Sequence, residues 1–504
     1  MKQQQDIVGV LGAGAMGRGI VQIALAGGYQ VRLFDANPDA VADAVAFITR
    51  MLNRAAEKGQ MEQVEAEQAI ANLTPVDSMA GFADCDIVVE AILEDLDIKK
   101  KVFAGFEEHV SETCVLATNT SSLSVTAIAS ACAHPERVAG FHFFNPVPLM
   151  KVVEVIEAVR TAPEVTAKLT EFAHEMGHRP VGALDTPGFL VNHAGRAFST
   201  EGFRILQEGI ADYPIVDDVM RDAAGFRMGP LELLDLTGLD VSFAVMNSIY
   251  DQFYQEPRYR PNALAQQRVN AGLFGRKTGG GFYQYEDNRR VPVPPVKAPD
   301  ALPDSIWIGA ATPSVQEVVR ELASAAGVPV EDGAAPSEAA LCLLSPVGED
   351  ATTAALEAGV NPQNTVALDP LFGLESHRTL MTTPVTTAAM RDAAHGLFGT
   401  SPIPVSVIHD SPGFVAQRIV ACIVNIGADI AQQRIATADD IDPAVKLGLG
   451  YPRGPLEWGD ELGAKTVLDI LEALHDFYGD PRYRPSPWLK RRALLGVPLT
   501  TPEG

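Results

Sequence analysis

A long internal repeat constrains the fold of this 504-residue chain more than any other feature. The segment DTPGFLVN at residues 185–192 returns as DSPGFVAQ at residues 410–417, an offset of 225 residues. Further pairs repeat in the same order: GFRMGPLELLDLTGLD at 225–240 with GYPRGPLEWGDELGAK at 450–465, and EPRYRPNAL at 256–264 with DPRYRPSPW at 480–488. This period is much longer than a solenoid unit, so we expect a duplicated domain.

The N-terminal part of the chain alternates short apolar runs with longer amphipathic stretches. The pattern predicts strands at residues 7–11, 31–34, 86–91 and 115–117, and helices at 20–26 and 40–57. Alternating strands and helices form a parallel, doubly wound sheet of the Rossmann type. From residue 185 onward, apolar residues recur at spacings near three and four, which predicts an all-α domain.

Two features divide the second half of the chain. The run VPVPPVKAPDALP at residues 291–303 favours an extended backbone, so we expect a linker there. After it come the strand-like runs IWIGA, ALCLLS and TVALDP, but the first turn reads GAATPS instead of a glycine fingerprint. This indicates a degenerate Rossmann-like domain at residues 304–408, with a mixed α/β spacer as the alternative. A second all-α copy at 409–504 completes the chain.

A glycine-rich turn opens the first domain. Gly12, Gly14 and Gly17 form GxGxxG between the first strand and its helix, where backbone amides can approach a pyrophosphate. Asp35 ends the second strand, and a carboxylate there accepts hydrogen bonds from ribose hydroxyls while repelling a 2′-phosphate. The turn therefore predicts NAD rather than NADP. A flavin, or a glycine turn packed without a ligand, is the alternative at this motif.

Composition narrows the classes of partner. A formal charge of -25 gives an average field that repels nucleic acid and anionic lipid, so we expect neither as a partner. The five cysteines are scattered without a CxxC pair, which argues against disulfides and a zinc site; we expect no metal. No run reaches the ~18 apolar residues of a membrane span, and we expect a cytoplasmic protein.

The segment VAGFHFFNPVPLMKVVEVI at residues 138–156 reads as strand, turn and strand. His142 lies on its first strand and Glu154 on its second, so the turn can bring the two side chains together. Alcohol oxidation needs a base that takes the hydroxyl proton while hydride leaves carbon, and a His paired with a carboxylate suits that role. The alternative is a core histidine that is hydrogen-bonded for structural reasons.

Several motifs together resemble one family. The sequence contains GAGAMG at 12–17, VVEAILED at 88–95, TNTSSLSVT at 118–126, HFFNPVPLMKVVEV at 142–155, DTPGFLVN at 185–192 and GRKTGGGFY at 275–283. In this order they resemble the 3-hydroxyacyl-CoA dehydrogenases. The duplicated C-terminal half is similar to that of the longer bacterial members, which serve phenylacetate breakdown.

The resemblance implies roles for individual residues. His142 would be the general base and Glu154 its partner, with Ser121 and Asn192 as polar groups near the reacting oxygen. The implied cofactor is NAD, with contacts from Gly12, Gly14, Met16, Gly17, Asp35, Glu90, Asn119, Ser121 and Asn145. The implied domains are residues 1–185 for NAD, 186–290 for substrate or dimerisation, the linker 291–303, the degenerate domain 304–408 and the helical duplicate 409–504.

The substrate implied by the resemblance is an acyl-CoA. Arg54 and Lys58, at i, i+4 spacing on a helix, are the basic residues implied for the CoA phosphates, although a solvated helix face explains them equally well. We expect a tail that ends in a carboxylate, with a 3-hydroxybutyryl chain as the alternative. Arg196 and Arg227 are candidate partners for such a tail.

Two questions stay open at this level. The position answering Asn192 in the second copy is Gln417, and no GRKTGGGFY follows, so we expect no second active site. The duplicate is expected to pack on the first helical copy within a monomer, unless the chain forms a homodimer. A non-catalytic NAD-binding relative and a dehydrogenase of free hydroxy acids or sugar acids are the competing functions.

Overall fold

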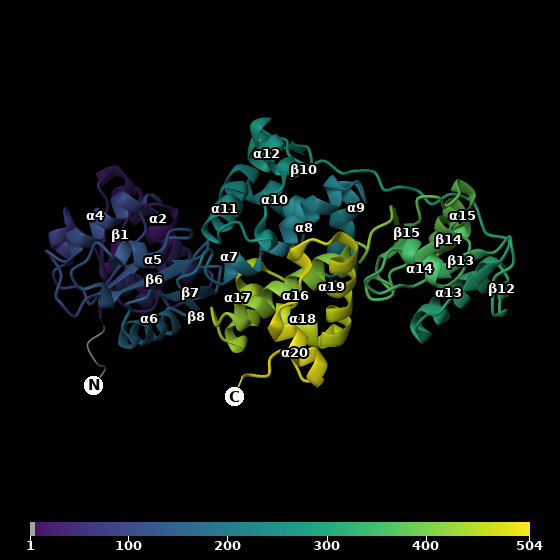
Figure 1. Ribbon diagram of the computed structural model, residues 1–504. Coiled ribbons are helices and arrows are strands. Elements are labelled where there is room, and N and C mark those ends of the chain that lie inside the picture. The colour runs from purple at the N-terminus through teal and green to yellow at the C-terminus, as the bar shows by residue number, and fades with distance from the viewer. Residues whose placement is uncertain (1–5, 504) are drawn as a thin grey trace. The chain divides into compact units, whose positions relative to one another are not determined.

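The computed structural model describes residues 6–503, which divide into two compact units (Figure 1). The first unit extends to His193 and also contains Gln433–Leu449. The second comprises Ala194–Gln432 and the residues from Gly450 onward. Residues 1–5 of the expected first domain and residue 504 of the last lie outside the described residues. No helix within residues 6–503 is both long and apolar enough to cross a membrane.

The first unit is built on an eight-stranded sheet in the order β3-β2-β1-β4-β5-β6-β7-β8. All neighbouring strands run parallel except β6 and β7, which are antiparallel. The strands are β1 (Ile7–Leu11), β2 (Gln30–Phe34), β3 (Leu73–Pro75), β4 (Ile87–Glu90), β5 (Val115–Thr118), β6 (Val138–Phe143), β7 (Val152–Glu157) and β8 (Arg179–Leu184). The Rossmann-type fold expected from the alternating pattern is confirmed.

Helices connect these strands. They are α1 (Ala15–Ala26), α2 (Pro38–Glu57), α3 (Gln63–Ala71), α4 (Leu96–Phe106), α5 (Val125–Ala129), α6 (Pro163–Glu175), α7 (Val191–Ala194) and α17 (Ala438–Leu449), with 3-10 turns η1 (Met79–Phe82) and η2 (Pro135–Arg137). Helix α1 begins five residues before the helix expected at 20–26, because the glycine turn itself starts the helix. β4 and β5 are wholly buried, which explains their continuous apolar sequence.

Most of the second unit is helical. Its first helical copy contains α8 (Arg196–Gln207), α9 (Tyr213–Asp218), the π-helix η3 (Val219–Ala223), α10 (Pro230–Thr237), α11 (Leu239–Gln252), η4 (Pro257–Tyr259), α12 (Ala263–Asn270) and η5 (Arg276–Thr278). A hairpin of β9 (Tyr285–Glu286) and β10 (Arg289–Arg290) follows. The second helical copy contains α16 (Ala416–Gln432), α18 (Pro455–Leu462), α19 (Ala464–Tyr478), η7 (Pro481–Tyr483) and α20 (Pro487–Leu495).

The second unit also contains a six-stranded sheet in the order β12-β11-β13-β14-β15-β16, here called the second α/β domain. Its elements are β11 (Ile306–Ile308), α13 (Pro313–Ala326), β12 (Val330–Glu331), β13 (Leu341–Leu344), α14 (Ala351–Glu357), η6 (Pro362–Asn364), β14 (Thr365–Leu368), β15 (Arg378–Thr382), α15 (Ala388–Gly399) and β16 (Val405–Ile408). Only β14 and β15 of this sheet pair in antiparallel fashion. The three strand-like runs seen in the sequence are all strands.

The two helical copies pack on each other through α8 and α16, which occupy equivalent places in the repeat. A buried ion-pair network joins them. Arg418 on α16, fully buried, contacts Glu201 at 3.1 Å and Glu208 at 2.9 Å on α8. Arg482 reaches the other oxygen of Glu201 at 2.7 Å. The duplicate therefore lies against the first helical copy within one chain.

The compact units do not follow the domain boundaries expected from the sequence. Residues 433–449, in the expected second helical domain, pack with the first sheet instead. The Leu184 amide donates to the Ile435 carbonyl at 2.8 Å, and the Gly182 amide donates to Asp440 of α17 at 3.3 Å. Helix α17 thus continues the edge beside β8. Residues 291–303 contain neither helix nor strand, in agreement with a linker.

Candidate active site

The glycine turn between β1 and α1 has the geometry that a dinucleotide requires. Gly12 has φ +109°, and a Cβ there would lie 2.4 Å from the Ala91 carbonyl oxygen. A Cβ on Gly17 would lie 1.8 Å from the Gly12 oxygen, so any side chain would break the turn. Gly14 faces open space, which leaves room for a ligand against the backbone. The residues present fit a pyrophosphate at this turn.

Asp35 lies at the carboxyl end of β2, beside this turn. Its Oδ2 accepts a hydrogen bond from the Ala13 amide at 2.8 Å, and its Oδ1 accepts one from the Asn37 amide at 2.9 Å. The carboxylate therefore holds the turn while standing at the position typical of ribose recognition. Met16 is partly buried and packs against the core of the sheet.

His142 and Glu154 meet at the antiparallel junction of β6 and β7. The register pairs them directly across the two strands, and such pairs have adjacent side chains. His142 Nδ1 lies 2.5 Å from Glu154 Oε2, and both side chains are buried. Because Nδ1 donates to the carboxylate, the lone pair resides on Nε2. This is the arrangement of a histidine prepared to accept a proton.

The second oxygen of Glu154 organises another segment. Oε1 accepts hydrogen bonds from the Leu190 amide at 2.9 Å and from the Val191 amide at 2.8 Å. These amides begin α7, which carries Asn192. A single buried carboxylate thus orients the imidazole and fixes the start of the helix that bears the next predicted site residue.

The loop after β5 carries Asn119 and Ser121. Asn119 Oδ1 accepts a hydrogen bond from the Phe143 amide at 2.8 Å, which ties the loop to the residue next to His142. The Ser121 amide donates to Glu94 at 2.9 Å. The structure therefore brings His142, Asn119 and Ser121 to the carboxyl edge of parallel strands, where such sheets bind ligands.

Glu94 and Lys99 complete this edge, and neither was predicted from the sequence. Glu94 Oε1 accepts hydrogen bonds from the Thr120 hydroxyl at 2.7 Å and the Ser122 hydroxyl at 3.0 Å, besides Ser121. Burial raises the pKa of Glu94, but the Thr120 hydrogen bond and the charge of Lys99 outweigh it, so the pKa lies below its ordinary value. The sequence signal was the second acid of VVEAILED, followed by a lysine one helical turn into α4.

Glu90, predicted as a cofactor contact, lies at the end of β4 and is engaged with neighbouring protein groups. Its carboxylate is fully buried and accepts hydrogen bonds from the Ile92 amide at 2.7 Å, Lys99 Nζ at 2.6 Å and the Thr118 hydroxyl at 2.7 Å. Three of the roughly four acceptor positions of this carboxylate are thus used within the protein, two on Oε1 and one on Oε2. Its side chain fixes the ends of β4 and β5. The exposed Asn145 lies in the β6–β7 connection, as the motif predicts.

A hollow of about 650 Å³ lies over α2 in the first unit. It is lined by Ala46, Thr49, Arg50, Asn53, Arg54 and Glu57. Arg54, predicted for the CoA phosphates, is one of the lining residues, and Arg50 is a second cation that was not predicted from the sequence. Lys58, the other predicted residue, is the C-cap of the helix and does not line the hollow. The i, i+4 spacing of Arg50 and Arg54 places both cations on one face.

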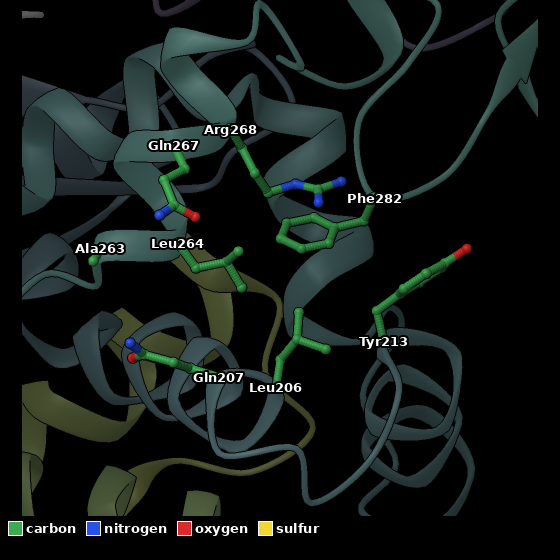
Figure 2. A pocket seen from close by; sticks show the side chains of 8 residues that line it. All are labelled: Leu206, Gln207, Tyr213, Ala263, Leu264, Gln267, Arg268 and Phe282. Carbon is green, nitrogen blue, oxygen red and sulfur yellow. The ribbon is translucent and has the colours of Figure 1, made fainter.

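The candidate tail partners lie in the second unit. Arg196 is half-buried on α8, and desolvation lowers its pKa to about 10 although nearby Tyr451 opposes the shift. Arg227 is exposed. A separate hollow of about 410 Å³ lies in the first helical copy, and the Arg268 guanidinium there is 3.9 Å from the centroid of the Phe282 ring. Figure 2 shows the side chains that line this hollow. Tyr213 stands beside that ring.

Comparison with protein families gives two matches. The model described as 3-hydroxyacyl-CoA dehydrogenase, NAD binding domain, matches residues 7–186. The model described as 3-hydroxyacyl-CoA dehydrogenase, C-terminal domain, matches twice, at residues 188–285 and 413–500. The double match agrees with the duplication expected from the internal repeat.

Individual relatives agree with these matches. The chain is 38% identical to the 3-hydroxyadipyl-CoA dehydrogenase of Escherichia coli over 97% of each sequence. It is 37% identical to the mitochondrial hydroxyacyl-coenzyme A dehydrogenase of Sus scrofa, over 55% of this chain and 91% of the relative. A crystal structure of a 3-hydroxybutyryl-CoA dehydrogenase from Escherichia coli superimposes with a TM-score of 0.85 at 36% identity, covering 98% of this chain and 99% of the other.

Proposed function

Because this chain belongs to the 3-hydroxyacyl-CoA dehydrogenase family, we propose that it oxidises (3S)-3-hydroxyadipyl-CoA to the 3-oxo thioester, with His142 as the base. The class of reaction, NAD-dependent dehydrogenation of a 3-hydroxyacyl-CoA, follows from the family. The base assignment is supported above all by the buried 2.5 Å contact between His142 and Glu154. We further propose that the enzyme is cytoplasmic and serves phenylacetate breakdown.

The chain's own residues would move one proton. The substrate hydroxyl gives its proton to His142 Nε2. The covalent C–H bond at C3 breaks as hydride leaves, and the C3 carbonyl forms. Glu154 stabilises the resulting imidazolium through Nδ1 and keeps the ring in place. Bound NAD supplies the hydride acceptor. Ser121 and Asn192 stand on the two segments tied to this pair, and we assign them to the reacting oxygen.

The remaining contacts are assigned from position and charge. The glycine turn and Asp35 would hold the adenosine half of NAD, with Asn119 and Asn145 nearer the nicotinamide. We assign the CoA phosphates to Arg54 and Arg50 over α2, where local cations overcome the acidic average of the protein. Glu90 is left out of this set because its oxygens are already engaged.

The acyl tail is assigned by likeness and by one half-buried cation. The relative that matches along 97% of the chain is named for an adipyl substrate, whose tail ends in a carboxylate. Such a group needs a cation, and we assign Arg196, four residues after Asn192 in the sequence. A 3-hydroxybutyryl substrate is the second candidate, favoured by the name of the superimposable crystal structure.

We also propose that the chain works as a monomer with two helical copies. The Glu201–Arg418–Arg482 network supports this, because it joins the copies through buried charges. A second chain would have to compete for a face that the duplicate already covers.

The experiment follows NADH oxidation at 340 nm while the purified protein reduces 3-oxoadipyl-CoA or acetoacetyl-CoA. His142→Gln should lower kcat by about 10²- to 10⁴-fold, the usual contribution of a general base. Arg196→Met should raise KM for the adipyl substrate and leave acetoacetyl-CoA nearly unaffected. NADPH and acetoacetate without CoA serve as the coenzyme and substrate controls.

The outcomes separate the competing functions. Equal kcat/KM for the two acyl chains in the wild type would shift the substrate to the short chain. Turnover of free acetoacetate would point to a dehydrogenase of free hydroxy acids. Absence of turnover with every thioester, despite NADH binding, would make the protein a non-catalytic relative.

A further inference from the structure

The second α/β domain keeps a cluster of polar residues at the positions that answer the active-site pair. β14 and β15 are its antiparallel strands, as β6 and β7 are in the first domain. Thr379 lies 225 residues after Glu154, which is the offset of the repeat. Asp369 faces Thr379 across the strands, with its amide 3.0 Å from the Thr379 carbonyl oxygen. Asp369 lies 227 residues after His142, because this strand connection is two residues shorter than its counterpart, and the cross-strand pairing places it where His142 stands in the first domain.

The counterpart of Asn192 closes the cluster from α16. Gln417 Nε2 donates to Asp369 Oδ1 at 2.9 Å, and Gln417 Oε1 accepts a hydrogen bond from the Gly348 amide at 2.9 Å. The Leu371 amide also donates to Asp369 Oδ1, at 3.0 Å. Asp369, Thr379 and Gln417 are each at most 1% exposed. One carboxylate oxygen thus joins the sheet to the second helical copy.

Two oxygens in this cluster are buried without a partner in the part of the chain that the structure describes. They are Asp369 Oδ2 and Thr379 Oγ1. In the first domain the equivalent His142 and Glu154 reach each other directly, but Asp and Thr are shorter by several atoms. Buried polar atoms are normally satisfied by protein or by water, whose share of liquid volume is ~30 Å³, so these two oxygens call for a bridging group.

We propose that Asp369, Thr379 and Gln417 form a closed binding site for one water molecule and one proton, which fastens the second α/β domain to the second helical copy. The water bridges Asp369 Oδ2 and Thr379 Oγ1. Compared with the first domain, Asp369 stands in place of the base His142, Thr379 stands in place of the orienting carboxylate Glu154, and Gln417 closes the site. None of these three residues is among those assigned to dehydrogenation.

The proton has a defined range. Burial raises the pKa of Asp369 to about 6, against hydrogen bonds from Gln417, Leu371 and Phe372 that lower it. Neighbouring titratable groups have other contacts, among them His377, whose Nε2 lies 2.9 Å from the Ser406 hydroxyl and whose Nδ1 lies 3.5 Å from Asp222. Asp350 and Asp410 cap α14, Arg378 donates to the Leu374 carbonyl, and Arg418 pairs with Glu201 and Glu208. Because the folded pKa exceeds the ordinary 3.8, the stabilisation is complete below 3.8 and is lost as pH rises through about 6.

The first test compares Asp369→Asn with the wild type in urea unfolding of the full chain between pH 4 and pH 8. The three tryptophans, Trp307, Trp458 and Trp488, all lie in the second half, so their fluorescence reports on this region. The ratio of the wild-type to the variant unfolding constant should rise about a hundredfold over this range, because it changes about tenfold for each pH unit between the unfolded and the folded pKa of Asp369. Asp392→Asn, at a half-exposed position on α15, is the control and should show no such change.

The second test addresses the water. Thr379→Val keeps the shape but removes the hydroxyl, and Thr379→Ser keeps the hydroxyl. If a water bridges the two oxygens, Val should raise the unfolding constant about fivefold relative to Ser, the equivalent of one hydrogen bond. If the hydroxyl is unpaired, Val should instead stabilise the domain, and the proposal fails. It also fails if the Asp369→Asn ratio is independent of pH. Dehydrogenase kcat should stay unchanged in all three variants, so these outcomes are separate from those of the proposed function.

Discussion

The two α/β domains of this chain share a framework but differ in chemistry. Each has a parallel sheet with one antiparallel junction, at β6–β7 in the first and at β14–β15 in the second. In the first domain that junction holds His142 and Glu154 in direct contact. In the second it holds Asp369 and Thr379, closed over by Gln417. The two domains therefore share an antiparallel strand junction, but the side chains that face each other across it differ.

The residues common to both copies are those that build the backbone. Asp185 accepts hydrogen bonds from the Val125 and Thr126 amides at the start of α5, and Asp410 accepts one from the Ala351 amide at the start of α14. In both copies the motif continues into a left-handed glycine and phenylalanine: Gly188 and Phe189, and Gly413 and Phe414. The repeated DTPGF and DSPGF segments are thus helix caps and turns, which explains why they are alike while the site residues are not.

The residues that differ are those that would bind ligands. Gly14 begins α1 without a side-chain cap, whereas Thr312 caps α13 by accepting a hydrogen bond from the Val315 amide at 3.4 Å. The first helix keeps its amides available for a phosphate, and the second satisfies one with its own side chain. The second domain also has no helix between β12 and β13, a stretch that the structure describes throughout, so it has no equivalent of α2 and its arginines.

The largest expected effect would come from replacing Glu154, the carboxylate that orients His142 in the first α/β domain. Glu154→Gln can present an amide to His142 Nδ1 and so favour the wrong tautomer. We expect kcat for acetoacetyl-CoA reduction to fall about 10²- to 10⁴-fold with little change in KM. Thr379→Val, at the equivalent strand position, should leave kcat unchanged. A kcat within about threefold of the wild type for Glu154→Gln would remove the functional contrast between the two junctions.

The next largest effect concerns the contact between the helical copies. Arg418→Met removes the fully buried cation shared by Glu201 and Glu208, although Arg482 still pairs with Glu201 and Arg204 with Glu208, and it should cost about 3 kcal/mol in the free energy of unfolding. Chemical denaturation followed by circular dichroism measures this loss, and light scattering reports whether the chain stays monomeric. Arg453→Met removes an exposed pair with Glu461 and should cost no more than about 1 kcal/mol. A mass of two chains in the wild type would contradict the single-chain pairing.

The same network predicts a pH effect of opposite sign to that of Asp369. Burial raises the pKa of Glu201, but the charges of Arg482 and Arg418 outweigh it and hold the pKa at about 2. Because the folded pKa lies below the ordinary 4.5, this stabilisation is present above pH 4.5 and is lost as pH falls toward 2. In Arg418→Met one of the two charges that lower this pKa is gone, so the pH-dependent loss in urea unfolding should be smaller than in the wild type and complete at a higher pH.

Much of this architecture could be predicted from sequence because it rests on local patterns. The strand at 7–11, the glycine turn and the strand, turn and strand at 138–156 depend on residues close in the chain. The repeat likewise indicated the duplicated helical domain without any knowledge of contacts. These signals survive because turns, caps and apolar periodicity are set within a few residues.

What could not be predicted depends on contacts between distant residues. Glu90 and Glu94 are both acids at or just after the end of β4. Only the fold shows that Glu90 accepts hydrogen bonds from Lys99 and Thr118, while Glu94 accepts one from the Ser121 amide. Helix α17 lies in the repeat yet packs with the first sheet. This packing could not be predicted, because its partner Gly182 on β8 is 258 residues away in the sequence. The pairing of Asp369 with Thr379 across β14 and β15 could be seen only once the strand register was known.

The smallest expected effect concerns the proposed CoA site, where the sequence pattern and the structure point to different residues. Both Arg54 and Lys58 fit the sequence pattern, but only Arg54 lines the hollow over α2, which the second domain lacks. Arg54→Ala should raise KM for acetoacetyl-CoA about fivefold without changing kcat, as expected for loss of one phosphate contact worth about 1 kcal/mol, and added salt should reduce the difference. Lys58→Ala should change KM less than about twofold. Acetoacetyl-N-acetylcysteamine has no phosphates, so an equal effect of Arg54→Ala on that substrate would place the arginine's role elsewhere.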